Sequence, residues 1–241
     1  MSSRASSESA EEPALITRFA EGEGSIERLR IDPWLCIVNK PAGLLCQPGL
    51  GPHQRDALIG RMQQEQPELR LVHRLDRDTS GVLLLARSAE ALRCLSQLFE
   101  RRLVQKLYVA DVLGRPAGLS GQFNWPLARL ERRPPRYGPH PLGRPSLTLW
   151  RLAEASGSCS RLWLRPHTGR SHQLRAHCAC FGLPILGDPL YGSASHQPSG
   201  LRRLHLHATA LAFRHPFTGE RVRVLSPPPF QLPCQTLIQA G

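Results

Sequence analysis

Hydrophobic residues along this chain fall into short runs separated by charged turns or turns rich in Gly and Pro. Two continuous apolar runs, at residues 34–38 and 82–86, are typical of strands buried on both faces. Further strands are predicted at residues 106–113, 147–152, 161–165, 205–213 and 221–225, the last two forming a hairpin. Because strands and helices do not alternate regularly, the pattern predicts an α+β fold built on a mixed, mainly antiparallel sheet.

Three segments have the hydrophobic spacing of amphipathic helices. They cover residues 54–66, 88–102 and 171–181. Ser88 and Ser171 are the expected N-caps of the second and third helices, because a serine hydroxyl can accept a hydrogen bond from a free backbone N–H. The residues expected on the buried faces are Leu58 and Met62 in the first helix, Leu92, Leu95 and Phe99 in the second, and Leu174, Cys178 and Phe181 in the third.

Two segments differ from the rest in composition. Residues 1–24 are rich in Ser, Glu and Ala, so we expect a disordered tail before a single catalytic domain over residues 25–241. Residues 114–145 are rich in Pro, Gly and Arg, which excludes a continuous helix. Arginines among aromatic residues suit phosphates and unstacked bases, although a merely solvated loop could have the same composition.

The formal charge is +12 at pH 7 and is unevenly distributed. The first 25 residues contain two arginines and five glutamates, a balance of −3, which leaves +15 for the remainder. Arginine supplies most of the positive charge, and its planar guanidinium suits phosphate groups. The charge therefore favours a nucleic acid as partner, with an ordinary solvated basic surface as the alternative.

The cysteines are seven in number, scattered, and mostly in apolar surroundings, at positions 36, 46, 94, 159, 178, 180 and 234. We interpret them as reduced thiols of a cytoplasmic protein. No run approaches the roughly 18 apolar residues that span a bilayer, and no basic segment followed by an apolar one stands at the N-terminus. A cytoplasmic monomer without a membrane segment is expected.

Candidate chemistry lies in residues 71–81, a charged turn that leads into the apolar run 82–86. Asp76 in this turn is flanked by Arg74 and Arg77, and a second basic motif, residues 169–175, begins the third helix. A carboxylate that attacks a sugar carbon or removes a sugar proton must be ionised, and a nearby arginine keeps it so. The two motifs are expected to converge, although an Asp in a turn can equally cap a backbone amide.

Other kinds of site receive less support. The motifs of serine hydrolases, P-loop nucleotide-binding proteins and dinucleotide-binding folds are absent from the sequence. Cys178 and Cys180 diverge by about 200° around a helix, which argues against a shared metal ion. No metal is therefore expected, although many residues of metal-ligating types are present, namely His167, His172, His177, Cys178, Cys180, His205 and His207.

Several motifs, in order, resemble those of the RluA-type RNA pseudouridine synthases. The resemblance covers residues 34–225, and its length and order make it specific. It rests on Asn39-Lys40-Pro41-Ala42-Gly43, His73-Arg74-Leu75-Asp76 with Thr79-Ser80-Gly81, Lys106-Leu107-Tyr108, Thr168-Gly169-Arg170-Ser171-His172-Gln173-Leu174-Arg175-Ala176-His177, Pro184-Ile185-Leu186-Gly187-Asp188-Pro189-Leu190-Tyr191-Gly192 and Leu206-His207-Ala208.

The resemblance implies a pseudouridine-synthase-like fold, an activity and a role for four residues. Asp76 resembles the aspartate that acts on the ribose of the target uridine, by adding to C1′ or by removing the C2′ proton. Arg175 is similar to the arginine that pairs with this aspartate, and Tyr108 to the tyrosine that stacks on the target base. Arg74 matches the arginine that replaces the flipped nucleotide in the RNA stack. The reaction it implies needs no cofactor.

The implied substrate is structured RNA, either a 23S rRNA stem-loop, a tRNA, or both. No separate RNA-binding domain is expected before the core. The alternative function is a non-catalytic RNA-binding or ribosome-assembly factor on the same fold. The residues expected to contact RNA, besides Arg74, are Lys40, Arg170, His172, Gln173, Arg132, Arg133 and Arg136.

Overall fold

The computed structural model describes residues 26–49, 51, 54–192 and 200–232, and within them most strands join one sheet. The strands are β1 (Arg28–Ile31), β2 (Leu35–Lys40), β3 (Arg70–Leu71), β4 (Ser80–Ala86), β5 (Gln105–Leu113), β6 (Ser120–Phe123), β7 (Leu127–Arg132), β8 (Pro135–Pro139), β9 (Thr148–Ser156), β10 (Cys159–Pro166), β11 (Leu206–Arg214) and β12 (Arg221–Leu225). The helices are α1 (Leu58–Glu65), α2 (Ala89–Glu100) and α3 (Gln173–Cys180).

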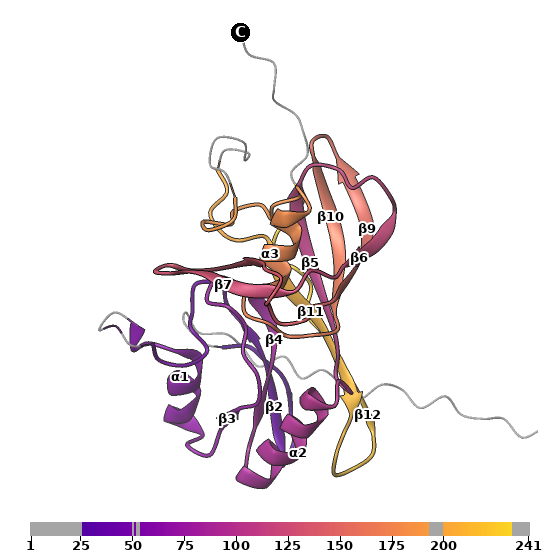
Figure 1. Cartoon of the computed structure of the whole chain (residues 1–241). Coiled ribbons are helices and arrows are strands. Elements are labelled where there is room, and N and C mark those ends of the chain that lie inside the picture. The colour runs from indigo at the N-terminus through magenta and orange to yellow at the C-terminus, as the bar shows by residue number, and fades with distance from the viewer. Residues whose placement is uncertain (1–25, 50, 52–53, 193–199, 233–241) are drawn as a thin grey trace, which may run out of the picture.

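The main sheet has the order β1-β2-β4-β11-β5-β10-β9-β6, with β12 paired to β11 and β3 to β4. The pairing of β11 with β4 is parallel and the other pairings of this sheet are antiparallel, so the expected α+β class is confirmed. The late strand β11 lies between β4 and β5, two strands that come much earlier in the chain (Figure 1).

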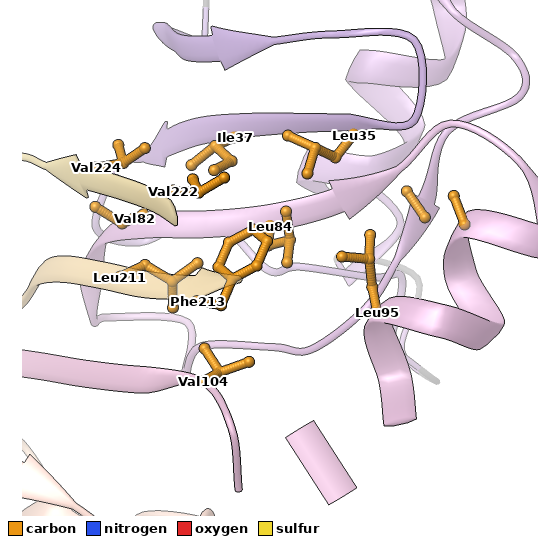
Figure 2. Packing of buried hydrophobic residues seen from close by; sticks show 12 residues of the cluster. Leu35, Ile37, Val82, Leu84, Leu95, Val104, Leu211, Phe213, Val222 and Val224 are labelled. Carbon is orange, nitrogen blue, oxygen red and sulfur yellow. The ribbon is translucent and has the colours of Figure 1, made fainter. Parts of the chain in front are cut away.

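Apolar side chains on alternate positions of β2 and β4 face opposite sides of the sheet. On one side, Leu35 of β2 and Leu84 of β4 pack with Leu95 of α2 and with residues of β11 and β12 (Figure 2). On the other side, Val38 of β2 and Leu83 of β4 pack with α1. Both strands are therefore covered on two faces, as their continuous apolar runs predict. In Figure 1, α1 and α2 accordingly lie against the same part of the sheet.

A third cluster lies under α3. Leu174 and Cys178 of this helix pack with Leu162 and Leu164 of β10 and with Val112 of β5. These contacts fix α3 beside the centre of the sheet. There, the first residues of the helix and the turn between β3 and β4 line a common cleft. The core thus sets where the basic motif at residues 169–175 lies.

The expectation for α2 is confirmed at its cap and for one face residue. The Ser88 hydroxyl accepts a hydrogen bond from the N–H of Ala91 at 3.0 Å, and Leu95 is buried. Leu92 and Phe99 are only partly buried, and the helix ends at Glu100 instead of residue 102. The expectation for α3 is partly wrong. His172, not Ser171, is the N-cap residue, and its left-handed backbone (φ 53°) makes no side-chain cap. Phe181 lies beyond the helix and is 40% exposed, because α3 ends at Cys180.

Residues 114–145 contain more structure than their composition suggests. They include β6, which pairs with β9 at one edge of the main sheet, and the separate hairpin β7–β8. The hairpin turns at Arg133 and Pro134 and projects from the body beside α3 (Figure 1). β1 and β3 were likewise not predicted. The tail expected at residues 1–24 lies outside the described residues, and the domain limits 25–241 stay a prediction.

Candidate active site

A cleft of about 850 Å³ lies where three connections of the chain meet. They are the turn between β3 and β4, the segment from α2 to β5, and the segment from β10 to α3. Asp76 and Glu100 are the acidic residues of its lining, whereas basic side chains are numerous. The arginines and lysine that line the cleft are Arg74, Arg102, Lys106, Arg165, Arg170 and Arg175.

Asp76 is held in the cleft by a tight turn. Its carbonyl oxygen accepts a hydrogen bond from the N–H of Thr79 at 3.2 Å, and β4 begins at the next residue. Gly81 then adopts φ 114°, and a Cβ there would overlap the carbonyl oxygen of Ala208 on β11. Only glycine permits this close approach of β4 and β11. The Asp76 carboxylate is 27% exposed, so it lies at the cleft surface on a rigid support.

Arg175 connects Asp76 to a second carboxylate that is not on the predicted list of site residues. Its Nη1 lies 3.6 Å from Oδ2 of Asp76. Its Nε and Nη2 donate to the two oxygens of Asp188, each at 2.8 Å. Both Arg175 and Asp188 are buried. The expected pairing of Asp76 with Arg175 is thus present in the structure, but the shorter, bidentate pair of this arginine is with Asp188.

Tyr108 forms another part of the cleft lining. It lies on β5, opposite Ala208 of β11 and Leu164 of β10. Burial raises the pKa of its hydroxyl, and the negative charge of Asp76 raises it further. The phenol therefore remains protonated at any working pH. It can stack or donate a hydrogen bond, but it cannot act as an anionic base.

Three further candidates lie around the same cleft. Arg74 is exposed beside Asp76, and Arg170 is partly exposed, with its Nε donating to the carbonyl oxygen of Pro145 at 3.3 Å. His172 lies within hydrogen-bond distance of the Tyr191 hydroxyl, at 3.1 Å from Nδ1. Burial lowers the pKa of this imidazole, so it is neutral at pH 7.

The hairpin β7–β8 carries the three remaining arginines. Arg132 and Arg133 are exposed near its turn. Arg136 on β8 pairs with Glu131 at 3.0 Å and its guanidinium lies 5.6 Å from the centre of the Tyr191 ring. Among the described residues these arginines do not line the cleft, but Tyr137 next to Arg136 contacts His172 at its edge.

Two of the expected RNA contacts are wrong. Lys40 is fully buried, and its ammonium donates to the carbonyl oxygens of Pro41, Leu44 and Arg77 at 2.6–2.9 Å. Its three N–H donors are used, so none is available for a phosphate.

Gln173 is also buried, and its side-chain amide is fully used within the protein. Its Oε1 accepts from Thr168 and from the backbone of Arg170, and its Nε2 donates to Leu147 and Thr148. Gln173 therefore holds the β10–α3 connection in place instead of contacting RNA.

Comparison with known proteins bears on this arrangement. The model of the family described as RNA pseudouridylate synthase matches residues 35–180, which include Asp76, Tyr108 and Arg175. The chain belongs to this family. It is an RNA pseudouridine synthase of the RluA type, an intramolecular isomerase, as the resemblance predicts.

Its relatives cover nearly all of the chain. It is 40% identical over 220 residues to the dual-specificity RNA pseudouridine synthase RluA of Pasteurella multocida (strain Pm70), which covers 90% of this chain and 100% of that protein. Identity to the protein of the same name from Escherichia coli (strain K12) is 38% over 210 residues, 83% of this chain and 95% of that one. The structure of human RNA pseudouridylate synthase domain containing 1 superposes with a TM-score of 0.73 at 28% identity, covering 88% and 87% of the two chains.

Sequence reasoning missed several residues of the site. Asp188 and Tyr191, which contact Arg175 but do not line the cleft, occur in the motif at residues 184–192, to which the sequence analysis assigned no site residue. Lys106 was quoted in a motif without a role, and Arg102 and Arg165 gave no signal. Lys106 could have been found from its spacing, because positions 106 and 108 of a strand face the same side.

The described part of the chain contains neither a candidate metal site nor a candidate membrane span. No group of three or more His, Cys, Asp or Glu side chains there converges in a way that could hold a metal ion. None of the described helices is long and apolar enough to cross a membrane. The six cysteines within the described residues are free thiols.

Proposed function

We propose that this enzyme converts a specific uridine to pseudouridine in a 23S rRNA stem-loop, a tRNA, or both, with Asp76 as the catalytic residue. The observation that carries the proposal is the position of Asp76, on a rigid turn at the cleft surface with Arg175 at 3.6 Å. The bacterial relatives are named dual-specificity RNA pseudouridine synthases, which supports more than one kind of RNA as substrate.

The chemistry fits a carboxylate site without a cofactor. The N1–C1′ bond of uridine breaks, the uracil turns, and C5 bonds to C1′. The proton on C5 is then lost and N1 gains one, so atoms and electrons balance without an external oxidant or reductant. Asp76 acts on the ribose through its carboxylate, and Arg175 holds this carboxylate in place.

Tyr108 stacks on the uracil in this proposal. Because its hydroxyl remains protonated, the ring contributes a surface for the base instead of a proton acceptor. A base inside an RNA helix cannot reach Asp76, so the target nucleotide must be flipped into the cleft. Arg74 fills the gap left in the RNA stack, a role supported by its exposed position next to Asp76.

The RNA backbone is bound by the basic rim. Arg170 lies at the cleft beside the neutral His172, which can contact RNA through a hydrogen bond, and Arg132, Arg133 and Arg136 extend the positive surface along the hairpin. Such contacts release counterions from the RNA, so binding should weaken steeply as salt increases.

The deciding experiment is a transcriptome-wide pseudouridine map of a strain that lacks the gene. The map should lose one or a few sites in rRNA or tRNA, and expression of the wild-type chain should restore them. Asp76→Asn should bind the same RNA with an unchanged dissociation constant and restore no site. Restoration of the sites by Asp76→Asn would refute the role of the carboxylate. A map without lost sites would favour a non-catalytic RNA-binding factor.

A further inference from the structure

The turn after α3 joins the reaction centre to the arginine hairpin. Asp188 in this turn is buried and accepts two hydrogen bonds from Arg175, at 2.8 Å each. Its Oδ1 also accepts from the backbone N–H groups of Leu190 and Tyr191, at 2.9 and 3.1 Å. One carboxylate therefore fixes the Arg175 guanidinium and the backbone of Tyr191 together.

Tyr191 extends this arrangement to the hairpin. Two guanidinium groups lie over its ring, with the Cζ atom of Arg175 5.2 Å and that of Arg136 5.6 Å from the ring centre. Its hydroxyl oxygen accepts a hydrogen bond from the backbone N–H of Tyr137, on β8, at 2.8 Å. A single side chain thus contacts both Arg175 and a strand of the hairpin.

The protonation states of Tyr191 and His172 allow the Tyr191 hydroxyl to donate one hydrogen bond and accept another. Burial raises the pKa of Tyr191 to about 12, so the hydroxyl keeps its proton. Burial lowers the pKa of His172, so its imidazole is neutral and Nδ1 can accept a hydrogen bond. In the tautomer with its proton on Nε2, His172 accepts the hydroxyl proton of Tyr191 at 3.1 Å, while the hydroxyl oxygen accepts from Tyr137. Both of its hydrogen-bonding roles are used by groups around the cleft.

The contact between Arg175 and Asp76 has the loosest geometry of this chain of interactions. Nη1 lies 3.6 Å from Oδ2 of Asp76, beyond ordinary hydrogen-bond distance, whereas the contacts of Arg175 with Asp188 are 2.8 Å. A small rotation of the guanidinium would therefore decide whether it orients the Asp76 carboxylate. A displacement of about 1 Å in an active site can cost 100-fold in rate.

We propose that Tyr191 is a positioning residue that couples the hairpin β7–β8 to the Asp76–Arg175 pair. When RNA engages the arginines of the hairpin, the position of β8 is transmitted through the Tyr137 N–H to Tyr191, and through Tyr191 to Arg175. The rate of the reaction then depends on how the hairpin holds the RNA. This inference rests on the proposed function.

The test removes the hydroxyl and keeps the ring. Tyr191→Phe should lower the single-turnover rate of pseudouridine formation by about tenfold or more. The dissociation constant for the RNA stem-loop found by the modification map should change less than twofold. A wild-type rate for this variant would overturn the coupling, and a loss explained entirely by weaker RNA binding would overturn it as well.

A control shows whether any lost buried hydroxyl has the same effect. Thr209 lies on β11 and does not line the cleft, and its hydroxyl donates to the carbonyl oxygen of Ser226 at 2.6 Å. Thr209→Val should lower the melting temperature but leave the single-turnover rate unchanged. If Thr209→Val slows the reaction as much as Tyr191→Phe, the effect of Tyr191 is one of general stability and the proposal fails.

A second measurement tests the coupling itself. Arg132→Gln should weaken RNA binding and lower the single-turnover rate in the wild-type background. In the Tyr191→Phe background the same change should weaken binding only, because the link is already broken. Equal effects on the rate in both backgrounds would refute the coupling. An inactive wild-type enzyme would instead contradict the proposed function, so the two failures are distinguishable.

Discussion

Replacement of Arg175 should affect stability and catalysis through two different carboxylates. Arg175→Met removes the partner of Asp188, which is buried and keeps the backbone donors of Leu190 and Tyr191. Removing one partner of a buried ion pair typically costs 3–5 kcal/mol, because the remaining charge is uncompensated. Since two N–H donors remain on Asp188, we expect the lower end, about 3 kcal/mol. Loss of activity in this variant alone would therefore be ambiguous.

A second substitution separates the two effects. Asp188→Asn in the Arg175→Met background removes the buried charge, and its amide oxygen can still accept from Leu190 and Tyr191. The double variant should regain about 1–2 kcal/mol relative to Arg175→Met, the difference between burying an unpaired carboxylate and burying an amide. It should nevertheless convert uridine at least about 100-fold more slowly than the wild type, because Asp76 still lacks its arginine.

The assay combines urea unfolding at pH 7 with single-turnover pseudouridine formation in excess enzyme. Stability should follow the order wild type, double variant, Arg175→Met, whereas both variants should be nearly inactive. If the double variant is no more stable than Arg175→Met, the buried charge of Asp188 is not the source of the penalty. If the double variant is as active as the wild type, Arg175 has only a structural role and the proposed pairing with Asp76 is wrong.

Three further predictions concern the cleft and the core. Tyr108→Phe keeps the ring that stacks on the base, so the single-turnover rate should fall less than about threefold. A loss of 100-fold would instead show that the hydroxyl takes part in proton transfer. Arg102 lines the cleft and the adjacent Arg101 does not. Arg102→Gln should therefore make the plot of log RNA-binding constant against log salt concentration less steep by about 0.7, whereas Arg101→Gln should leave its slope unchanged. Equal slopes for the two variants would show that Arg102 does not contact the RNA. Burial lowers the pKa of His207 from 6.5 to about 4, so its contribution to stability is present above pH 6.5 and is lost as the pH falls towards 4. Between pH 7 and pH 5 the wild type should lose about 2 kcal/mol more in urea unfolding than His207→Gln, and equal losses would show that His207 is not buried in its neutral form.

Elements with a local signal could be predicted from sequence. The cap at Ser88 and the helical spacing of Leu95 specify α2, and continuous apolar runs specify β2 and β4. The hairpin β11–β12 follows from two apolar segments around a turn. By contrast, β7 and β8 contain many Pro and Arg residues, so the sequence lacks the alternation of apolar and polar positions by which a strand is recognised. Their existence could not be predicted by a pattern of buried residues.

The candidate site likewise has a part that could be predicted from the sequence and a part that could not. The turn around Asp76 is local, and its chemistry follows from neighbouring residues. The pair of Arg175 with Asp188 depends on how the chain folds back after α3, and nothing in the residue types distinguishes this carboxylate from other turn aspartates. Lys40 was misread because lysines are rarely buried. Three carbonyl oxygens surround its ammonium, and only the folded structure reveals them.

The position of β11 has a consequence for how the enzyme is made on the ribosome. This strand lies between β4, which follows Asp76, and β5, which carries Tyr108. Until β11 has been synthesised, both neighbours have unpaired edges, and nothing fixes the distance between the carboxylate and the tyrosine. A nascent chain stopped before residue 206 therefore holds separate halves of a site and exposes sheet edges that favour aggregation. Activity can appear only after residues 206–214 have been synthesised and have filled the middle of the sheet.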